Sequence, residues 1–306
     1  MPASMPEHDI AAVASRLGFA AAGFAAAGDA IGSDAFAQWL ARGDAAGMDY
    51  LHRHAPLRRH PAAIVPDVHS IIAVAARYPV NPSPAAGGFC MTARCRDYHD
   101  VLRDKLRLLS NFIKQRTAAR TTRICVDSAP LPEREWALRA GLGWQGRQGQ
   151  LVSPGAGTCT VLGFLLTDLV LSPAKPMENR CGDCRRCIES CPSGAIRPNA
   201  QIDARRCLSY LTIEHPGEIA PERQSAMGQA LFGCDICTSI CPWNQTATAP
   251  VMPELAESTG PLPDAAGITA MPPDTFAARF RGTAVKRTGL DHLQRNAAIA
   301  LSNAAP

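Results

Sequence analysis

Features that would carry a chain into or across a membrane are missing from this sequence. Its longest apolar run, residues 161–171, is short and contains Asp168, so no segment is expected to span a bilayer. The first ten residues, MPASMPEHDI, lack a basic stretch followed by an apolar one, and we expect no signal peptide. Both observations predict a chain that stays in the reducing cytoplasm.

A strong charge of either sign is missing too. The 31 Lys and Arg residues nearly balance the 27 Asp and Glu residues, and the formal net charge is +4. Such an excess permits a polyanionic partner but does not demand one. The 306 residues, 46% of them hydrophobic, suffice for a sizeable core and one to three domains.

Cysteine, in contrast, is abundant at close spacing. Eight of the twelve cysteines lie in residues 181–241. The run from Cys181 to Pro192 has the spacing C-x2-C-x2-C-x3-C-P, typical of bacterial ferredoxins, in which three thiolates bind one cubane cluster and the fourth binds another. The run from Cys234 to Pro242 has only C-x2-C-x3-C-P. It lacks one ligand, and Cys207 is the one candidate inside the stretch.

The ligand count predicts two [4Fe–4S] clusters. The first is expected on Cys181, Cys184, Cys187 and Cys241, and the second on Cys191, Cys207, Cys234 and Cys237. Two four-cysteine zinc sites would use as many thiolates, but zinc sites favour separated C-x2-C pairs. Disulfides would require an exported chain. The spacing therefore favours iron–sulfur clusters over both alternatives.

Hydrophobic periodicity divides the chain into three parts. Residues 1–175 mix helical and strand patterns and predict an α/β (or α+β) domain, with a buried strand at 70–78 and a long helix at 97–116. Residues 176–246 form a ferredoxin-like module, in which 203–214 and 221–232 are expected to be helices. Residues 247–306 are a linker and a short helical segment.

Asp127 and a glycine-rich turn are the candidate site residues of the first domain. Asp127 follows a predicted strand at 121–126, so its carboxylate is expected to project from the sheet edge into a cleft. A turn-forming aspartate is the plain alternative. The turn from Gly141 to Gly146 suggests a close backbone approach to a bulky ligand, although an ordinary helix end accounts for Gly141.

Motifs from three regions of the chain occur together in the order of one enzyme family. They are Gly47-Met-Asp-Tyr-Leu51, Asp97-Tyr-His99, Val126-Asp-Ser-Ala-Pro130, Ala140-Gly-Leu-Gly-Trp144, Arg206-Cys-Leu-Ser-Tyr-Leu-Thr-Ile-Glu214, Gly233-Cys-Asp, Cys241-Pro-Trp-Asn244, Lys286-Arg and Arg295-Asn. On these motifs the chain resembles epoxyqueuosine reductase from about residue 10 to its end. That family is cobalamin-dependent, carries two [4Fe–4S] clusters and completes queuosine at the wobble position of certain tRNAs.

The resemblance implies a function and a set of partners. An external low-potential donor would supply electrons, which pass through the clusters to cobalamin (as cob(II)alamin) and reduce epoxyqueuosine in tRNA to queuosine. Asp127 would be the proton donor, and Arg58, Cys90, Asp127 and Gly146 would contact cobalamin. Outside the resemblance, Arg58 is interpreted as a solvated cation and Cys90 as a small buried hydrophobe. We expect a monomer, with a C-terminal segment similar to HEAT repeats.

Two further expectations concern histidine. The sequence has no Asp-x-His-x-x-Gly run to supply a lower-face ligand, so the cobalt is expected to lack a protein histidine. Tyr98 and His99 open the long helix, where they are interpreted as a core tyrosine and a solvent-facing histidine. Neither is assigned a catalytic role.

The basic segment 279–295 is the candidate tRNA surface. It contains Arg279, Arg281, Lys286, Arg287 and Arg295. On charge alone a solvated helix face explains it. The family's Lys-Arg and Arg-Asn positions recur at Lys286-Arg287 and Arg295-Asn296, which favours tRNA binding by Lys286, Arg287 and Arg295.

The chain departs from the family pattern at three places. Gly146 is followed by Arg147-Gln148 where Lys-Asn is usual, Thr238 stands where Gln is usual, and the chain stops early in the helical-repeat region of longer members. Two other functions remain open at this point. A reductive dehalogenase would share the cofactors, and a plain electron carrier would need only the clusters.

Overall fold

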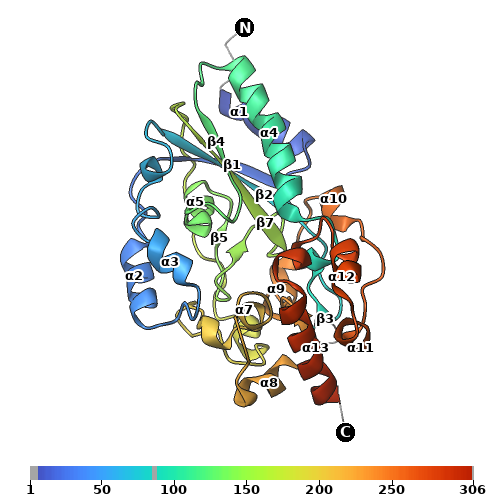
Figure 1. The fold of residues 1–306 in the computed structure, drawn as a ribbon. Helices are drawn as coiled ribbons and strands as arrows, with labels where there is room; N and C mark the ends of the chain where they lie inside the picture. Colours follow the sequence, from blue (N-terminus) through green and yellow to red (C-terminus); the bar gives the residue numbers. More distant parts are fainter. Residues whose placement is uncertain (1–5, 85–87, 305–306) are drawn as a thin grey trace.

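A four-stranded antiparallel sheet lies at the centre of the first part of the chain (Figure 1). The computed structural model describes residues 6–84 and 88–304. The strand order is β1-β2-β7-β4, and every neighbouring pair is antiparallel. The bounds are β1 Ala21–Ala26, β2 Ser70–Arg77, β4 Thr122–Cys125 and β7 Thr160–Thr167. An antiparallel sheet with helices packed on it is an α+β arrangement.

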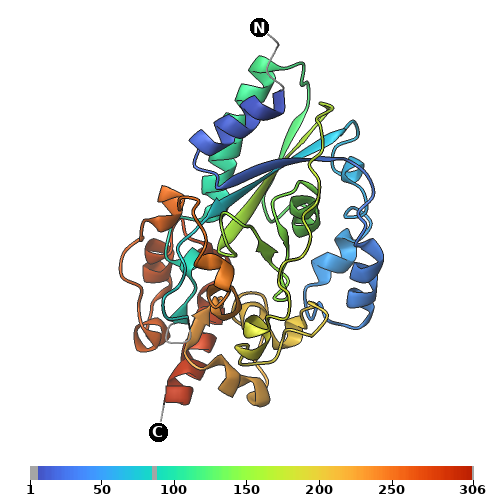
Figure 2. The ribbon, with the colours of Figure 1, turned by 180° about the vertical axis from the view of Figure 1, so that it is seen from behind.

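The two faces of this sheet are covered by different helices. Helices α1 (Pro6–Arg16) and α4 (Tyr98–Arg116) pack side by side on one face (Figure 2), and α5 (Glu133–Arg139) packs on the other. Side chains of β2 alternate between them: Ile72 and Val74 join the first core, whereas Ile71 and Ala73 join the second. Because β2 is buried on both faces, its sequence is a continuous apolar run, and this run is the pattern that predicts the buried strand at 70–78.

The iron–sulfur module consists of short elements. They are α6 Arg186–Glu189, η3 Ala204–Arg206, α7 Leu208–Ile213, α8 Pro221–Met227, β8 Ala230–Phe232, α9 Ile236–Ser239 and η4 Pro242–Asn244. The helix predicted at 221–232 is therefore wrong in its second half. Gly228 adopts φ +50°, which ends α8. The residues that follow pair in parallel with β3 (Gly88–Phe89), a partner that local sequence does not reveal.

Strands β6 (Leu151–Val152) and β7 belong to two different sheets. Strand β6 pairs with β5 (Trp144–Gln145), and β7 pairs with β2 and β4. The remaining elements of the first part are α2 Ser33–Ala41, α3 Asp49–His54, η1 Pro61–Ala63 and η2 Met91–Ala93.

The C-terminal segment shares a core with both other parts. Its elements are α10 Pro253–Ala256, α11 Ala265–Thr269, α12 Pro273–Arg279, η5 Ala284–Arg287 and α13 Leu290–Ala304. Apolar residues of these helices pack with Phe89 of the first part and Phe232 of the module. The expected segment similar to HEAT repeats is helical, and its kinship to repeats stays a prediction. Among the described helices, none has both the length and the apolarity that crossing a membrane demands.

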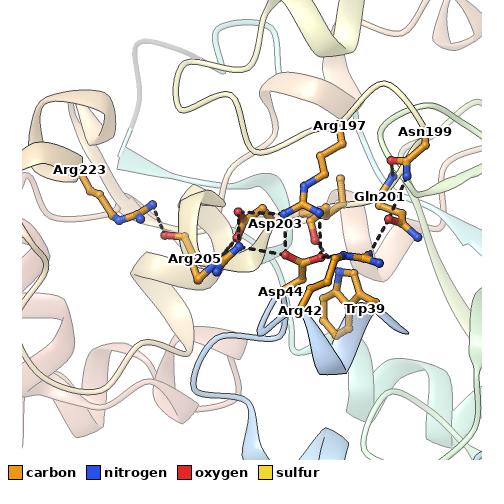
Figure 3. A network of polar contacts seen from close by, with 10 residues as sticks. Trp39, Arg42, Asp44, Arg197, Asn199, Gln201, Asp203, Arg205 and Arg223 are labelled. Atoms are coloured by element: carbon orange, nitrogen blue, oxygen red, sulfur yellow. Dashed lines mark hydrogen bonds and ion pairs between the residues drawn. The ribbon is translucent and has the colours of Figure 1, made fainter. Parts of the chain in front are cut away.

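A buried carboxylate fastens the first part to the module (Figure 3). The Asp44 side chain is fully buried and accepts hydrogen bonds from Arg42, Arg197 and Arg205 at 2.6–3.0 Å. Its backbone carbonyl accepts from the amide of Ala204, in η3. Cys207 follows η3 directly, so this contact fixes the segment that carries a predicted cluster ligand.

Candidate active site and iron–sulfur centres

Asp127 lies where the sequence predicts, at the end of β4. Its side chain is 60% exposed, and its backbone has φ +55°, a left-handed conformation that aspartate tolerates better than most residues. Its amide donates a 2.6 Å hydrogen bond to the Glu133 carboxylate, in the first turn of α5. The strand and the helix together hold Asp127 in an open position beside the sheet.

His99 joins Asp127 to the buried start of α4. The His99 Nε2 atom lies 3.0 Å from Asp127 Oδ2, and Nδ1 lies 2.6 Å from Asp97 Oδ1. Asp97 also caps the helix by accepting from the His99 amide. His99 is only 3% exposed, so the expectation of a solvent-facing histidine is wrong. Both ring nitrogens face carboxylates, and a protonated imidazole donates to both.

The chain of charges continues to the C-terminal segment. Arg287 donates from Nε and Nη2 to Asp97 Oδ2, at 3.2 and 3.0 Å. Burial alone would raise the pKa of Asp97, but hydrogen bonds from His99 and Arg287 lower it to about 2. Burial would likewise lower the pKa of His99, but the two carboxylates raise it above its usual value. Near neutral pH, Asp97 is an anion, and its charge favours the protonated form of His99.

Other titratable groups surround Asp127 on the side of α5. Burial, followed by the nearby charge of Asp127, raises the pKa of Glu133 to about 8. The same two causes raise the pKa of Glu214, after α7. Arg58, whose guanidinium lies over the Phe36 ring at 5.3 Å, is close enough to interact with Glu133. The structure thus places Arg58 in the same group of charges as Asp127, and its contact with cobalamin stays a prediction.

Cys90 lies instead against the iron–sulfur module. Its amide donates to the Phe232 carbonyl, and its thiol packs so closely on Gly233 that a Cβ there would come within 2.5 Å of the sulfur. Cys90 and Cys234 line the same cavity, of about 460 Å³. Burial raises the pKa of the Cys90 thiol to about 12. Its predicted contact with cobalamin would therefore be made as a neutral thiol, near the second cluster site.

Gly146 is accounted for by packing within the chain. A Cβ at this position would lie 2.1 Å from the side-chain oxygen of Gln148 and 2.8 Å from Val152. A Cβ at Gly143 would likewise lie 2.0 Å from the Val152 carbonyl oxygen. The close approach inferred from these glycines is to protein atoms, and a contact between Gly146 and cobalamin stays a prediction.

The cysteines of the module converge in two groups. Cys187 and Cys241 are both electrostatic neighbours of Cys181, and Cys241 is also a neighbour of Cys184. In the other group, Cys234 and Cys237 are both neighbours of Cys207 and Cys191. These pairs fall within the two sets predicted from spacing, and the assignment of the ligands to two clusters stays a prediction. Helices α6 and α9 pack against each other, and Cys237 is also an electrostatic neighbour of Cys187. The two groups are therefore adjacent.

Most cations of the basic segment are already bound within the chain. Arg279 donates to three backbone carbonyls. Arg295 uses all five of its N–H donors, on the carbonyls of Leu211, His215 and Gly217 and on Asn296. Of the five cations in this segment, Arg281 and Lys286 are exposed, and their side chains have no hydrogen-bond or ion-pair partner among the described residues. The predicted tRNA contacts of Arg287 and Arg295 remain predictions.

Sequence reasoning missed four residues of this site. They are Asp97, His99, Glu133 and Glu214. The motif Asp97-Tyr-His99 did contain a signal, because an Asp cap two residues before a histidine can hold the imidazole. The remaining partner, Asp127, is 28 residues away in sequence, and nothing local points to it.

Fold and site together define an iron–sulfur oxidoreductase. A family model described as "4Fe-4S double cluster binding domain" matches residues 180–244, which contain all eight predicted ligands. A second, "Epoxyqueuosine reductase QueG, DUF1730", matches residues 58–128, which contain Arg58, Cys90 and Asp127. The module is thus a double-cluster domain, as predicted.

Relatives named epoxyqueuosine reductase match most of the chain. The one from Aliivibrio fischeri is 36% identical over 304 residues, which cover 95% of this chain and 81% of the relative. The one from Escherichia coli is 37% identical over 276 residues, covering 87% and 73%. The chain belongs to the epoxyqueuosine reductase family. The resemblance drawn from the motifs is confirmed.

Solved structures of the same family superpose on nearly the whole chain. The crystal structure of an epoxyqueuosine reductase with a tRNA(Tyr) epoxyqueuosine-modified stem loop gives a TM-score of 0.88 at 28% identity, and covers 97% of this chain and 81% of that one. The Streptococcus thermophilus enzyme gives 0.83 at 30% identity, covering 97% and 80%. The match therefore includes the α+β domain, the module and the C-terminal segment.

Proposed function

We propose that this chain reduces epoxyqueuosine to queuosine at the wobble position of tRNA, in the cytoplasm, with electrons that pass through two [4Fe–4S] clusters. The observation that carries the proposal is the Asp97–His99–Asp127 site beside a double-cluster module, in a chain of the epoxyqueuosine reductase family. One of the superposed relatives was crystallised with an epoxyqueuosine-modified stem loop, which supports tRNA as the substrate.

The reaction requires protons as well as electrons. Conversion of an epoxide to an alkene takes up two electrons and two protons and releases the oxygen as water. His99, whose pKa is raised by the two carboxylates, is proposed to give its proton to Asp127 across their 3.0 Å contact. Asp127 is exposed on the edge of the sheet and passes this proton to the departing oxygen. The second proton comes from solvent, which reaches the exposed Asp127 and recharges the pair.

Cobalamin is the proposed cofactor between clusters and substrate. When bound, it supplies low-valent cobalt as the immediate reductant. The amide nitrogen of Gln148 is buried and has no hydrogen-bond partner among the described residues, so it suits an acceptor on a ligand such as the amide side chains of a corrin. The same turn is tied to Arg134, next to Glu133, through the Gly149 carbonyl. Both ring nitrogens of His99 lie within hydrogen-bond distance of carboxylates, and the absence of a histidine ligand to cobalt stays a prediction.

The cluster ligands are proposed as two sets. Cys181, Cys184, Cys187 and Cys241 would bind one cluster, and Cys191, Cys207, Cys234 and Cys237 the other; the convergence of the thiols in these groups supports the division. An external low-potential donor would reduce the clusters. On the tRNA side, Lys286 and the exposed Arg281 are the cations best placed to meet phosphate.

Single-turnover reduction tests the proposal. Anaerobically purified protein with both clusters, cobalamin and a chemical reductant should convert an epoxyqueuosine stem loop to queuosine, followed by mass spectrometry of the released nucleoside. A visible spectrum recorded while cobalamin is added should show its binding. Absence of product with bound corrinoid and intact clusters would refute the proposed reaction.

A further inference from the structure

Arg287 occupies an unusual place for a residue expected to bind tRNA. Both of its bonded nitrogens point at the same oxygen of Asp97, whose side chain is only 7% exposed. The other oxygen of that carboxylate faces His99. The two oxygens of Asp97 are therefore divided between Arg287 and His99, and a shift of one partner is transmitted to the other.

The backbone holds this arrangement in place from both sides. Arg287 is the last residue of η5, whose Ala284 and Val285 are buried in the core of the C-terminal segment. Two residues before η5 begins, the Gly282 carbonyl accepts a 2.7 Å hydrogen bond from the Asp97 amide. The C-terminal segment thus contacts the start of α4 twice, and both contacts are to the residue that orients His99.

A phosphate group would have to compete with this ion pair. The Arg287 side chain is 47% exposed, and withdrawing its guanidinium would leave Oδ2 of the buried Asp97 carboxylate without its cationic partner. The preceding residue, Lys286, is exposed and has no such acceptor among the described residues. Of these two adjacent cations, one is therefore committed to the interior and the other is available to a polyanion.

We propose that Arg287 is a positioning residue of the active site, which acts through Asp97 and His99 to hold the carboxyl group of Asp127. The C-terminal segment then completes the catalytic site in addition to any contact it makes with tRNA. The inference rests on the proposed role of Asp127 as proton donor. Other ionisable groups facing this series of charges are Tyr50, Tyr98, Glu133 and Glu214, and none of them replaces Arg287 as a cation beside Asp97.

Two measurements separate positioning from tRNA binding. In Arg287→Ala, the single-turnover rate at saturating stem loop should fall roughly 10- to 100-fold, because Asp127 is no longer held in its productive orientation. Stem-loop affinity and its salt dependence should stay at the wild-type level. Arg287→Lys keeps the charge without the planar fork and should recover part of the rate. Arg107→Ala is the matched control, since it removes an arginine from an exposed pair with Asp104 on α4.

The titration of His99 tests the coupling without any substrate. It can be followed by nuclear magnetic resonance of protein labelled with 15N-histidine, with the signal assigned from its absence in His99→Gln. Removal of the Arg287 cation should move the titration to higher pH, because the imidazolium no longer has a positive neighbour. This measurement needs neither corrinoid nor tRNA. It therefore tests the coupling between Arg287 and His99 independently of whether the protein reduces epoxyqueuosine. An unmoved His99 titration in Arg287→Ala, with lower affinity and a shallower salt dependence, would make Arg287 a phosphate contact and overturn the proposal.

Discussion

The His99 Nε2 atom lies 3.0 Å from Asp127 Oδ2, and this contact joins a buried histidine to an exposed carboxyl group. The Asp127 side chain is largely exposed to solvent, whereas His99, in the first turn of α4, is buried. A proton held on His99 is therefore sheltered from solvent exchange by its surroundings but remains one hydrogen bond from Asp127. This geometry suits delivery of a proton from a buried group to an exposed carboxyl group, as the proposed reaction requires.

Replacing His99 should alter both the rate and its dependence on pH. His99→Gln keeps a hydrogen-bond donor near Asp127 but holds no exchangeable charge, so single-turnover reduction should slow by roughly 10²- to 10⁴-fold. Because the two carboxylates raise the pKa of His99, the wild-type imidazole keeps its proton to a higher pH than an ordinary histidine and loses it as the pH rises further. The wild-type rate should therefore decline on the alkaline side, and the His99→Gln profile should lack that decline. An identical profile in both proteins would remove His99 from the proton path.

Replacing Asp127 should stop the reaction and leave the cofactors in place. Asp127→Asn removes the acidic proton while keeping the size of the side chain, and no product is expected in a single turnover. Asp127→Ser should behave in the same way. Asp104→Asn, on the exposed face of α4, serves as the control. If Asp127→Asn reduces epoxyqueuosine at a rate close to that of the wild type, Asp127 is only a turn residue.

The parts of this protein that sequence predicts are those set by local pattern. The cysteine spacing fixes the module because cubane clusters need thiolates at short, regular intervals. The unbroken apolar run of β2 predicts a strand buried on both faces. The apolar residues of β4 likewise predict the strand after which Asp127 stands. Each of these signals lies within a few residues of the feature it predicts.

The parts that sequence does not predict depend on distant partners. A histidine at the start of a helix is ordinarily solvated, and only the packing of α4 beside β4 buries His99. Arg287 finds Asp97 across 190 residues of sequence. Strand β8 forms because β3 offers an edge, against the helical pattern of 221–232. Charge composition likewise does not show that Arg279 and Arg295 donate hydrogen bonds to backbone carbonyls of the same chain.

Cys207 offers a test of how the clusters are divided. Its thiol is an electrostatic neighbour of Cys191, and both are neighbours of Cys234. Anaerobic wild-type protein should contain about eight iron atoms per chain, and Cys207→Ala should lose about four of them. Cys159→Ala, a buried cysteine outside the module, should keep the full amount. Full retention of both clusters in Cys207→Ala, or zinc in place of iron, would refute the assignment.

Asp44 should contribute strongly to stability. Asp44→Ala leaves three arginines around a buried position without their carboxylate, and the free energy of unfolding should fall by about 3 kcal/mol. Asp104→Ala breaks only an exposed pair and should change it by less than about 0.5 kcal/mol. Urea unfolding under anaerobic conditions measures both. Equal effects of the two substitutions would show that the arginines around Asp44 are stabilised equally well by solvent.

Replacing Lys286 and replacing Arg295 should affect different properties, although both residues lie in the basic segment: the first should affect stem-loop binding, the second stability. Lys286 is exposed and unpartnered among the described residues, so Lys286→Ala should weaken stem-loop binding and reduce the slope of log affinity against log salt by about 0.7 to 0.9 for each phosphate that is no longer neutralised. Arg295 donates every N–H to carbonyls of α7 and of the turn after it, and to Asn296. Arg295→Ala should therefore lower the melting temperature, because three backbone carbonyls lose their donor, and should leave the salt slope unchanged. Filter binding over a salt titration, together with thermal unfolding of the same proteins, measures both effects. A reduced salt slope in Arg295→Ala at unchanged melting temperature would place the phosphate backbone on α13 instead.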